Sequence, residues 1–395
     1  MAALDGVKVI CVGQFYFAPY CTMLMARLGA DVVKVEAPEG DPYRRLPTAD
    51  EHGVSVQFQF MNAGKRLIRL DLKKPDGQRI LRDLAAQADV LVQNLAPGAM
   101  DRFGLGYSSL REVNPRLIVA SGTGFGSYGP YAGEPAMDLT IQARTAVMST
   151  TGFAEGAPVR TGPSVVDFMA GAHLVAGVLA ALYQREQTSR GQHVEVSLQD
   201  AIIPSLTSNI AGYLTSEGMM PERTGNRHGG LAVTPYNAYE CADGWVTILC
   251  PTDAHWRRFA EMTDDAEAMN PRLGTMAGRC AAGDHVDAIV GRWARPRPKD
   301  LIGKVLKEAN IPCAPVVTLP ELIDDPHVRA RGMLHDSRDE HGTFTTLGSP
   351  LSLSDSPSAE VGRAGGLGEH TDEVLAELLG MSETELAALR QAEVI

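Results

Sequence analysis

Two aspartates, both at predicted helix starts, are candidates for a catalytic carboxylate. Asp167 lies in RTGPSVVDFMAG, directly after an apolar pair and at the start of a long apolar helical pattern. Asp138, in GEPAMDLTIQA, also precedes a helical pattern. A carboxylate at a helix start accepts hydrogen bonds from the first-turn amides, so each residue fits a helix N-cap. The same position fixes the carboxylate near positive backbone dipoles, which suits a catalytic group as well.

A glycine motif, Gly124-x-Gly126-x-x-Gly129, matches the dinucleotide fingerprint and follows a predicted strand. The next residues, Pro130 and Tyr131, do not open the helix that must hold the pyrophosphate, so a surface loop is favoured over a nicotinamide or flavin site. The chain has no Gly-x-Ser-x-Gly elbow, no His-Glu-x-x-His and no Walker loop, and its ten histidines are scattered. We therefore expect no metal site, serine hydrolase or P-loop NTPase.

Composition narrows the class of protein further. The 395 residues predict two or three domains, and 36 basic against 48 acidic residues give a net charge of −12. A nucleic-acid partner would call for a basic block, and the chain has only basic pairs. Six cysteines without a Cys-x-x-Cys pair fit a reducing cytoplasm. The apolar stretch 170–183 is too short to span a bilayer, so no membrane partner is expected.

The elements that must position these residues alternate between strands and helices. Apolar runs at 7–12, 32–35, 90–92 and 117–120 predict strands, and the patterns at 19–28 and 75–88 predict helices. This alternation indicates a parallel, doubly wound sheet, which binds ligands beyond the carboxyl ends of its strands. Long helices are predicted over 167–187 and 198–214. A hairpin turning at Asp243-Gly244 then begins a smaller α+β region.

Six phrases, in this order, are similar to one family. They are GADVVKVEAPEGDPYR (29–44), NAGKRLIRLDLKKPDG (62–77), NLAPGAMDRFGLGY (94–107), RTGPSVVDFMAGAHLVAGVLAAL (160–182), SRGQHVEVSLQDA (189–201) and GEHTDEVLAEL (368–378). Together they resemble the class III CoA-transferases, the formyl-CoA transferase and carnitine CoA-transferase group, which also contains the α-methylacyl-CoA racemases. The resemblance runs from about residue 5 to the C-terminus.

The resemblance implies an architecture. A large Rossmann-like, CoA-binding domain of α/β class would be formed by both chain ends, residues 1–224 and 330–395, with a small α+β domain at 225–329. Two such subunits would interlock as a cytoplasmic homodimer. The use of the fold to bind coenzyme A would also explain why the sheet lacks a dinucleotide fingerprint.

The resemblance also implies that Asp167 is the catalytic residue. Its carboxylate would attack an acyl-CoA thioester to give a mixed anhydride, and the CoA thiolate would return to form an aspartyl-CoA thioester. The substrates would be an acyl-CoA and a carboxylic acid, with no bound prosthetic group. Backbone amides near Asp167 and in the 15–18 loop would stabilise oxyanions. The residues expected to assist are Asp138, Met137, Phe15, Tyr16, Ala18, Gly229 and Gly230.

Met137 separates the two activities of the family. The racemases carry a histidine directly before the aspartate of the motif that here reads AMDLTIQA, and methionine can neither take nor give a proton. A racemase or isomerase is therefore disfavoured but stays an alternative. A non-catalytic acyl-CoA-binding protein, in which Asp167 is only a cap, is another.

The same matching predicts the residues that contact coenzyme A. They are Arg102, Asn94, Leu95, Ala99, Met100, Lys73 and Arg44, with the basic side chains as phosphate partners. Ala37-Pro38 replaces a basic residue of formyl-CoA transferase, so part of the phosphate clamp differs. The tetraglycine loop of that enzyme reads GNRHGG here (225–230), so oxalate specificity is not supported. Arg227 or His228 could instead meet a carboxylate on a larger acid.

Overall fold

The computed structural model describes residues 1–48, 55–339 and 342–395, which form two compact units. Unit 1 comprises Met1–Ile141, Ser164–Ile202 and Ile323–Ile395. Unit 2 comprises Gln142–Pro163 and Ile203–Leu322. Two of the unit boundaries fall inside short helices, α6 (Asp138–Arg144) and α15 (Leu319–Ile323). Unit 1 therefore contains both ends of the chain.

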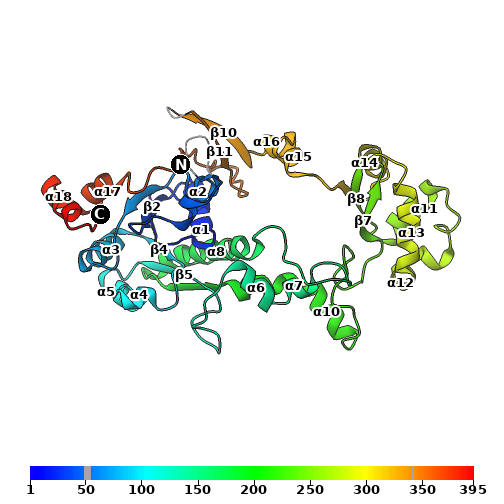
Figure 1. Cartoon of the computed structure of the whole chain (residues 1–395), viewed down its shortest axis with the longest axis horizontal. Coiled ribbons are helices and arrows are strands. Elements are labelled where there is room, and N and C mark those ends of the chain that lie inside the picture. The colour runs from blue at the N-terminus through cyan, green and yellow to red at the C-terminus, as the bar shows by residue number, and fades with distance from the viewer. Residues whose placement is uncertain (49–54, 340–341) are drawn as a thin grey trace. The chain divides into compact units, whose positions relative to one another are not determined.

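The centre of unit 1 is a six-stranded sheet with the order β3-β2-β1-β4-β5-β6, and every neighbouring pair is parallel. Its strands are β1 (Lys8–Cys11), β2 (Asp31–Glu36), β3 (Arg66–Arg69), β4 (Val90–Gln93), β5 (Ile118–Thr123) and β6 (His193–Ser197). Strands β2, β4 and β5 are labelled in Figure 1. This arrangement confirms the predicted α/β class with a parallel sheet. Four of these strands, β1, β2, β4 and β5, are predicted from the sequence, whereas β3 and β6 are not.

Helices cover both faces of this sheet. Ile10 of β1 shares a core with Ile80 and Leu84, whereas the neighbouring Cys11 accepts a hydrogen bond from the Thr22 hydroxyl at 3.4 Å on the opposite face. Alternate residues of a strand point to opposite faces, which is why β1 is apolar at all three positions after Lys8. Unit 1 also contains α1 (Phe17–Arg27), α2 (Val56–Asn62), α3 (Pro75–Gln87), α4 (Ala99–Arg102), α5 (Tyr107–Val113), α8 (Val165–Thr188), α9 (Leu198–Ile202), α16 (Pro326–Ala330) and the 3₁₀ helix η1 (Pro42–Arg45).

The C-terminal segment completes unit 1 beside β3. It contains the hairpin β10 (Leu334–Asp339) and β11 (Gly342–Leu347), then α17 (Thr371–Leu379) and α18 (Glu383–Gln391). The Leu67 amide donates to His370 Nδ1 at 3.1 Å, and the His370 amide donates back to the Leu67 carbonyl at 3.0 Å. These bonds satisfy backbone groups at the β3 edge of the sheet, which would otherwise stay open.

Unit 2 is a smaller α+β body with its own core. An antiparallel sheet of β7 (Tyr236–Cys241), β8 (Gly244–Leu249) and β9 (Cys313–Pro315) packs against helices through buried side chains such as Trp256, Phe259 and Ile289. Its helices are α7 (Val147–Thr150), α10 (Thr207–Thr215), α11 (Asp253–Thr263), α12 (Met276–Ala281), α13 (Gly283–Ala294) and α14 (Lys299–Glu308), with 3₁₀ turns η2 (Ile203–Leu206) and η3 (Pro271–Gly274). The hairpin of β7 and β8 is present as predicted, but its turn is formed by Ala242 and Asp243, one residue before the predicted Asp243-Gly244, because Gly244 already pairs with Cys241.

Two helix predictions need correction. The helix expected over 198–214 is broken into α9, η2 and α10, because Pro204 lacks the amide hydrogen that a continuous helix requires. The helix predicted over 167–187 is α8 (Val165–Thr188), whose 24 residues are by length and composition enough to cross a membrane, contrary to the expectation from the shorter apolar stretch 170–183. Buried core helices pass the same test, and 39% of its most apolar window is buried.

Candidate functional site

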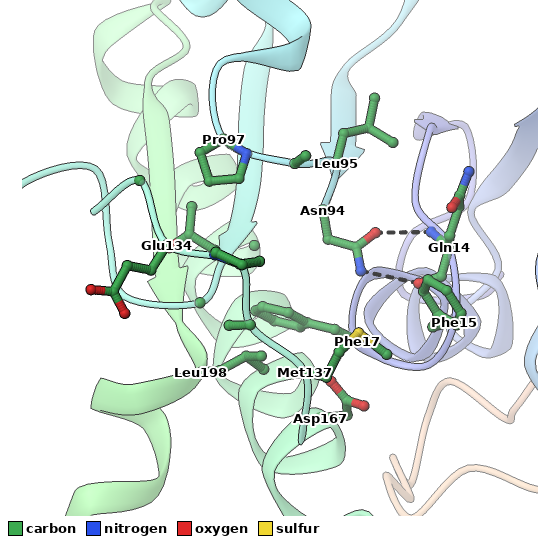
Figure 2. A pocket seen from close by; sticks show the side chains of 17 residues that line it. Gln14, Phe15, Phe17, Asn94, Leu95, Pro97, Glu134, Met137, Asp167 and Leu198 are labelled. Atoms are coloured by element: carbon green, nitrogen blue, oxygen red, sulfur yellow. Dashed lines mark hydrogen bonds between the residues drawn. The ribbon is translucent and has the colours of Figure 1, made fainter. Parts of the chain in front are cut away.

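A cavity of about 480 Å³ lies in unit 1 beyond the carboxyl ends of β1, β4 and β5 (Figure 2). Turns after these strands, the loop before α6 and the first residues of α8 and α9 supply its lining: Gln14, Phe15, Phe17, Asn94, Leu95, Ala96, Pro97, Gly122, Thr123, Gly124, Gly133, Glu134, Pro135, Ala136, Met137, Asp167 and Leu198. β1 and β4 are neighbours in the sheet but are separated by two strands in the chain. Ligands of open α/β sheets bind at such a switch point.

Asp138 caps α8 from outside that helix. Its Oδ2 accepts hydrogen bonds from the amides of Val166 at 2.9 Å and Asp167 at 3.2 Å. Ser164, the residue at the N-cap position of α8, makes no side-chain cap bond. The capping role that the sequence left open for both aspartates therefore belongs to Asp138, while Asp167 lies in the first turn that Asp138 caps.

The Asp167 carboxylate is left open to the cavity. It is half-buried and accepts no hydrogen bond from any residue in the described parts of the chain. Burial and, to a smaller extent, the nearby negative charge of Asp138 together raise the pKa of Asp167 from its ordinary 3.8 to about 7. Both causes disfavour the charged form. A carboxylate that holds its proton up to neutral pH is more basic, and a better nucleophile once ionised, than an exposed one.

The turn between β1 and α1 forms the wall beside Asp167, and several bonds fix its backbone. Asn94 accepts from the Gln14 amide at 2.8 Å and donates its side-chain amide to the Gln14 carbonyl at 3.0 Å (Figure 2). A Cβ on Gly13 would lie 2.4 Å from the Cβ of Ala18, so only glycine fits there. Phe15 has a φ of 62°, a strained value for a residue with a side chain.

The start of α1, of which Phe17 lines the cavity, has backbone amides that are not used in helix hydrogen bonds. Neither Phe17 nor Ala18 donates its amide to an acceptor within the residues described, as is usual for the first turn of a helix without a side-chain cap. The α8 amides expected to stabilise oxyanions are instead bonded to Asp138. Of the two predicted sources of backbone donors, only the 15–18 turn therefore still has donors to offer.

A second cavity of about 270 Å³ shares part of its lining with the first. The two share Gln14, Leu95 and Ala96, and the second extends along Ala37, Pro38, Leu72, Lys73, Ala99 and other residues after β2, β3 and β4. Lys73 and Ala99, both predicted CoA contacts, line it. Met100 is buried in the core, and Arg102 is exposed at the end of α4, where it donates to the Pro97 carbonyl at 3.2 Å.

Arg44 has different partners from those predicted. Its guanidinium forms two bonds of 2.7 Å with the Glu36 carboxylate, donates to the Gly365 carbonyl at 3.2 Å and lies 3.9 Å from the centre of the Phe58 ring. Such a bidentate, stacked arginine has few donors left. We therefore do not assign Arg44 to the phosphates of coenzyme A.

All six cysteines are free, and no group of three or more metal-binding side chains occurs among residues 1–48, 55–339 and 342–395. A family model described as CoA-transferase family III matches residues 4–371. The chain belongs to CoA-transferase family III.

Named relatives agree with this CoA-transferase assignment. The chain is 38% identical to formyl-CoA:oxalate CoA-transferase of Streptomyces coelicolor, covering 100% of this chain and 99% of the relative. It is 37% identical to succinyl-CoA:mesaconate CoA-transferase of Haloarcula hispanica, covering 95% and 96%. The fold matches a CaiB/BaiF family protein from Brucella suis with a TM-score of 0.83 and 33% identity, covering 95% and 99%. The protein is thus a CoA-transferase that acts on CoA thioesters.

The remaining predicted residues of this CoA-transferase lie in different places. Met137, the residue before Asp138, lines the cavity, and its amide donates a hydrogen bond to the Thr140 hydroxyl at 2.9 Å. Gly229 and Gly230 belong to unit 2, not to the unit that holds Asp167. In unit 2, Arg227 is held by Asp287 at 2.7 Å and by Asp284 at 2.6 Å, so its charge is already matched.

Sequence reasoning missed several residues of the cavity wall. Phe17, Glu134 and Leu198 line it together with Asp167 (Figure 2). Phe17 could have been predicted as a cavity residue, because it follows the first predicted strand closely in the sequence. Leu198 carried no local signal, since it belongs to an apolar pattern like many others and comes to the cavity only through the pairing of β6 with β5.

Proposed function

We propose that this CoA-transferase moves coenzyme A from an acyl-CoA to a carboxylic acid through covalent intermediates on Asp167. The observation that carries the proposal is the open, partly desolvated carboxylate of Asp167 in a cavity at the switch point of the sheet. A carboxylate nucleophile needs no metal or nucleotide triphosphate here, because thioester, anhydride and aspartyl thioester are all activated acyl groups.

The cycle balances in four acyl transfers. Ionised Asp167 attacks the thioester carbon, forms an anhydride and expels the CoA thiolate. The thiolate attacks the aspartyl carbonyl, forms the aspartyl-CoA thioester and expels the donor acid. The acceptor carboxylate then attacks that thioester, which forms a second anhydride and expels the thiolate again. The thiolate finally attacks the acceptor acyl carbon, which gives the new acyl-CoA and restores Asp167.

The two adjoining cavities suit the two parts of coenzyme A. The nucleotide end would occupy the smaller cavity, where Lys73 offers a positive charge to a phosphate. Arg102, at the end of α4, lies in sequence between Ala99 and Phe103, which also line this cavity. The thioester end would pass the shared residues Gln14, Leu95 and Ala96 to reach Asp167. Open amides at the start of α1 would stabilise the oxyanion of each tetrahedral intermediate.

A trapping experiment tests the role of Asp167. The wild-type enzyme is incubated with acyl-CoA, quenched and digested, and the peptide containing Asp167 is examined by mass spectrometry for a CoA adduct. Hydroxylamine added during turnover should convert the same side chain to a hydroxamate. Absence of both products from an enzyme that exchanges CoA would overturn the proposal.

The acid pair is best found by an exchange screen. Succinyl-CoA, acetyl-CoA and formyl-CoA are offered as donors against monocarboxylates and dicarboxylates, including oxalate and mesaconate because relatives are named for them. Deuterium uptake from solvent at the α-carbon without any acceptor acid would instead favour a racemase. Tight CoA binding without exchange would favour a non-catalytic binding protein.

We further propose that the enzyme is a cytoplasmic homodimer whose subunits interlock. The support is the surface of α8, where Ala172, Ala176 and Ala180 are exposed and Tyr183 is 72% exposed, although the helix is apolar enough to be buried. A second subunit would remove this apolar surface from water. Light scattering at micromolar concentration should give twice the mass of 42.3 kDa, and a monomer mass would contradict the proposal.

A further inference from the structure

The start of α1 packs closely against the face of α8 that carries Asp167. Asp167 and Gly171 stand four residues apart on α8, so they share one face of that helix and lie about one turn apart. A Cβ on Gly171 would lie 2.8 Å from the Phe17 carbonyl oxygen and 2.9 Å from the Tyr20 ring. The centre of the Tyr20 ring also lies 4.8 Å from that of Phe168, the residue after Asp167. The backbones of α1 and α8 are therefore in close contact one turn from the nucleophile.

Glycines enclose the two residues of α1 whose amides are open. At Gly171 the obstacle to a side chain is the Phe17 carbonyl, a backbone group that cannot turn away as the end of a side chain can. A Cβ on Gly122 of β5 would lie 2.6 Å from the Phe17 ring, and one on Gly13 would lie 2.4 Å from the Ala18 Cβ. A side chain at any of these positions would displace the start of α1, so its place depends on these close contacts.

A buried lysine also holds this turn. Lys65 Nζ donates to the Pro19 carbonyl and to the Thr22 hydroxyl, both at 2.9 Å, and to Asn62 Oδ1 at 3.1 Å. The Thr22 hydroxyl in turn donates to the Ala18 carbonyl at 3.1 Å. Lys65 is 3% exposed and forms no ion pair within residues 1–48, 55–339 and 342–395. Such burial is unfavourable for an ammonium group and lowers the pKa of Lys65 to about 7. What this costly burial provides is a fixed first turn of α1.

The turn that is held in this way is the one with backbone donors to offer. Neither Phe17 nor Ala18 donates its amide to an acceptor in the described parts of the chain, and Phe17 lines the same cavity as Asp167 (Figure 2). A donor that stabilises an oxyanion must be held within about 0.5 Å of its productive place. Tight packing and buried hydrogen bonds behind the turn are the supports that such precision requires.

We propose that Gly171 and Lys65 are positioning residues that fix the open amides of α1 beside Asp167 for the oxyanions of acyl transfer. Gly171 sets the distance between α1 and α8, and Lys65 prevents the first turn of α1 from moving. Neither residue lines either cavity, so each acts through the α1 backbone and not by touching the substrate. This inference rests on the proposed role of Asp167 and adds the device that holds the oxyanion donors in place.

Gly171→Ala tests the distance between the helices. The added methyl group must displace the Phe17 carbonyl, so kcat for CoA exchange should fall about tenfold to a hundredfold, as expected for a displaced oxyanion donor. The KM for acyl-CoA should stay within about twofold of wild type, because these donors act in the transition state. Gly177→Ala is the matched control on the same helix. Its Cβ would meet a side-chain atom of Val194 at 2.7 Å, roughly 15 Å along the helix from Asp167, so this variant should keep the wild-type kcat.

Lys65→Met tests the support at the first turn of α1. Methionine fills a similar volume but donates no hydrogen bond, so kcat should fall about tenfold while the KM for acyl-CoA again stays within about twofold. Lys299→Met is the matched control, because it removes a lysine that bonds Glu321 in unit 2, and it should leave kcat unchanged.

The affinity for free CoA, measured by calorimetry, separates positioning from general structural damage. It should stay within about twofold of wild type in Gly171→Ala and Lys65→Met, because neither residue lines the cavities. An unchanged kcat in either variant, an equal loss in Gly177→Ala, or a loss of CoA affinity as large as the loss of kcat would each overturn the inference. The proposed function is judged separately, by whether the wild type forms the Asp167 adduct.

Discussion

The starts of α6 and α8 each carry an aspartate, and the two carboxylates differ in what surrounds them. Asp138, the first residue of α6, is bound by the amides of Val166 and Asp167. Asp167, in the first turn of α8, receives no hydrogen bond in the part of the chain that the structure describes, and it faces a cavity. One carboxylate stabilises a helix, while the other is desolvated and open to a substrate.

The difference shows that tertiary neighbours, not position in a helix, set the role of each aspartate. A carboxylate in the first turn is normally stabilised in its charged form by the helix dipole. The pKa of Asp167 is raised all the same, because burial and the charge of Asp138 outweigh that effect. By occupying the first amides, Asp138 also takes away the donors that would otherwise stabilise the Asp167 carboxylate.

The largest expected effect comes from removing the nucleophile. Asp167→Asn should reduce CoA exchange by about a thousandfold or more, since covalent catalysis is lost. The free energy of unfolding at pH 8 should stay equal or rise, because an unpaired, partly buried charge is removed. Exchange is measured by chromatography of acyl-CoA products, and unfolding by urea titration. Residual exchange near the wild-type rate would refute the division of roles between the two aspartates.

The pH dependence of the wild type should show the next largest effect. Because Asp167 must be ionised to attack, kcat/KM for acyl-CoA should fall about tenfold per pH unit below its pKa of about 7 and level off above it.

The protonation of Asp167 also affects the free energy of unfolding. A raised folded-state pKa adds stability that is present below the ordinary 3.8 and lost as the pH rises through about 7. Asp167→Asn should lack this loss. An acid limb centred near pH 4 would contradict the assignment.

Much of the fold could be predicted because local signals agreed with the tertiary structure. The run 7–12 is apolar except for Lys8, and Val9, Ile10 and Cys11 of β1 are indeed buried. β6 was missed because His193 and Glu195 interrupt its apolar pattern. Pro204 was a visible break, but the apolar periodicity on both sides of it suggested one helix. Pairing partners such as β5 for β6 depend on residues distant in the sequence, which local patterns do not encode.

The site was predictable only in part, for a similar reason. Asp167 and Asn94 belong to phrases that resemble a family, and both line the cavity. Local context could not decide which aspartate caps α8, because the cap comes from a residue 28 or more positions away. Arg44 was predicted to bind a phosphate of coenzyme A because its positive charge is evident from the sequence. Its bidentate ion pair with Glu36 is evident only from the structure.

Truncating the cap should have a moderate effect on stability. Asp138→Ala removes the acceptor of two first-turn amides, and loss of a helix cap costs about 0.5–2 kcal/mol of the free energy of unfolding. Urea titration at pH 8 measures this loss against Asp167→Asn, which should show none. Equal destabilisation by both substitutions would mean that the two carboxylates are not divided between support and chemistry.

The smallest effect should come from removing the charge of Asp138 but not its cap. Asp138→Asn keeps a side-chain oxygen that can accept from Val166 and Asp167, so unfolding should change little. Without the like charge, the pKa of Asp167 should fall below about 7, yet stay above 3.8 because burial is the larger cause. The acid limb of kcat/KM therefore moves to lower pH, and activity at pH 6 rises relative to pH 8. An unmoved limb would show that burial alone sets the basicity of Asp167, so that the two helix starts are coupled through hydrogen bonds and not through charge.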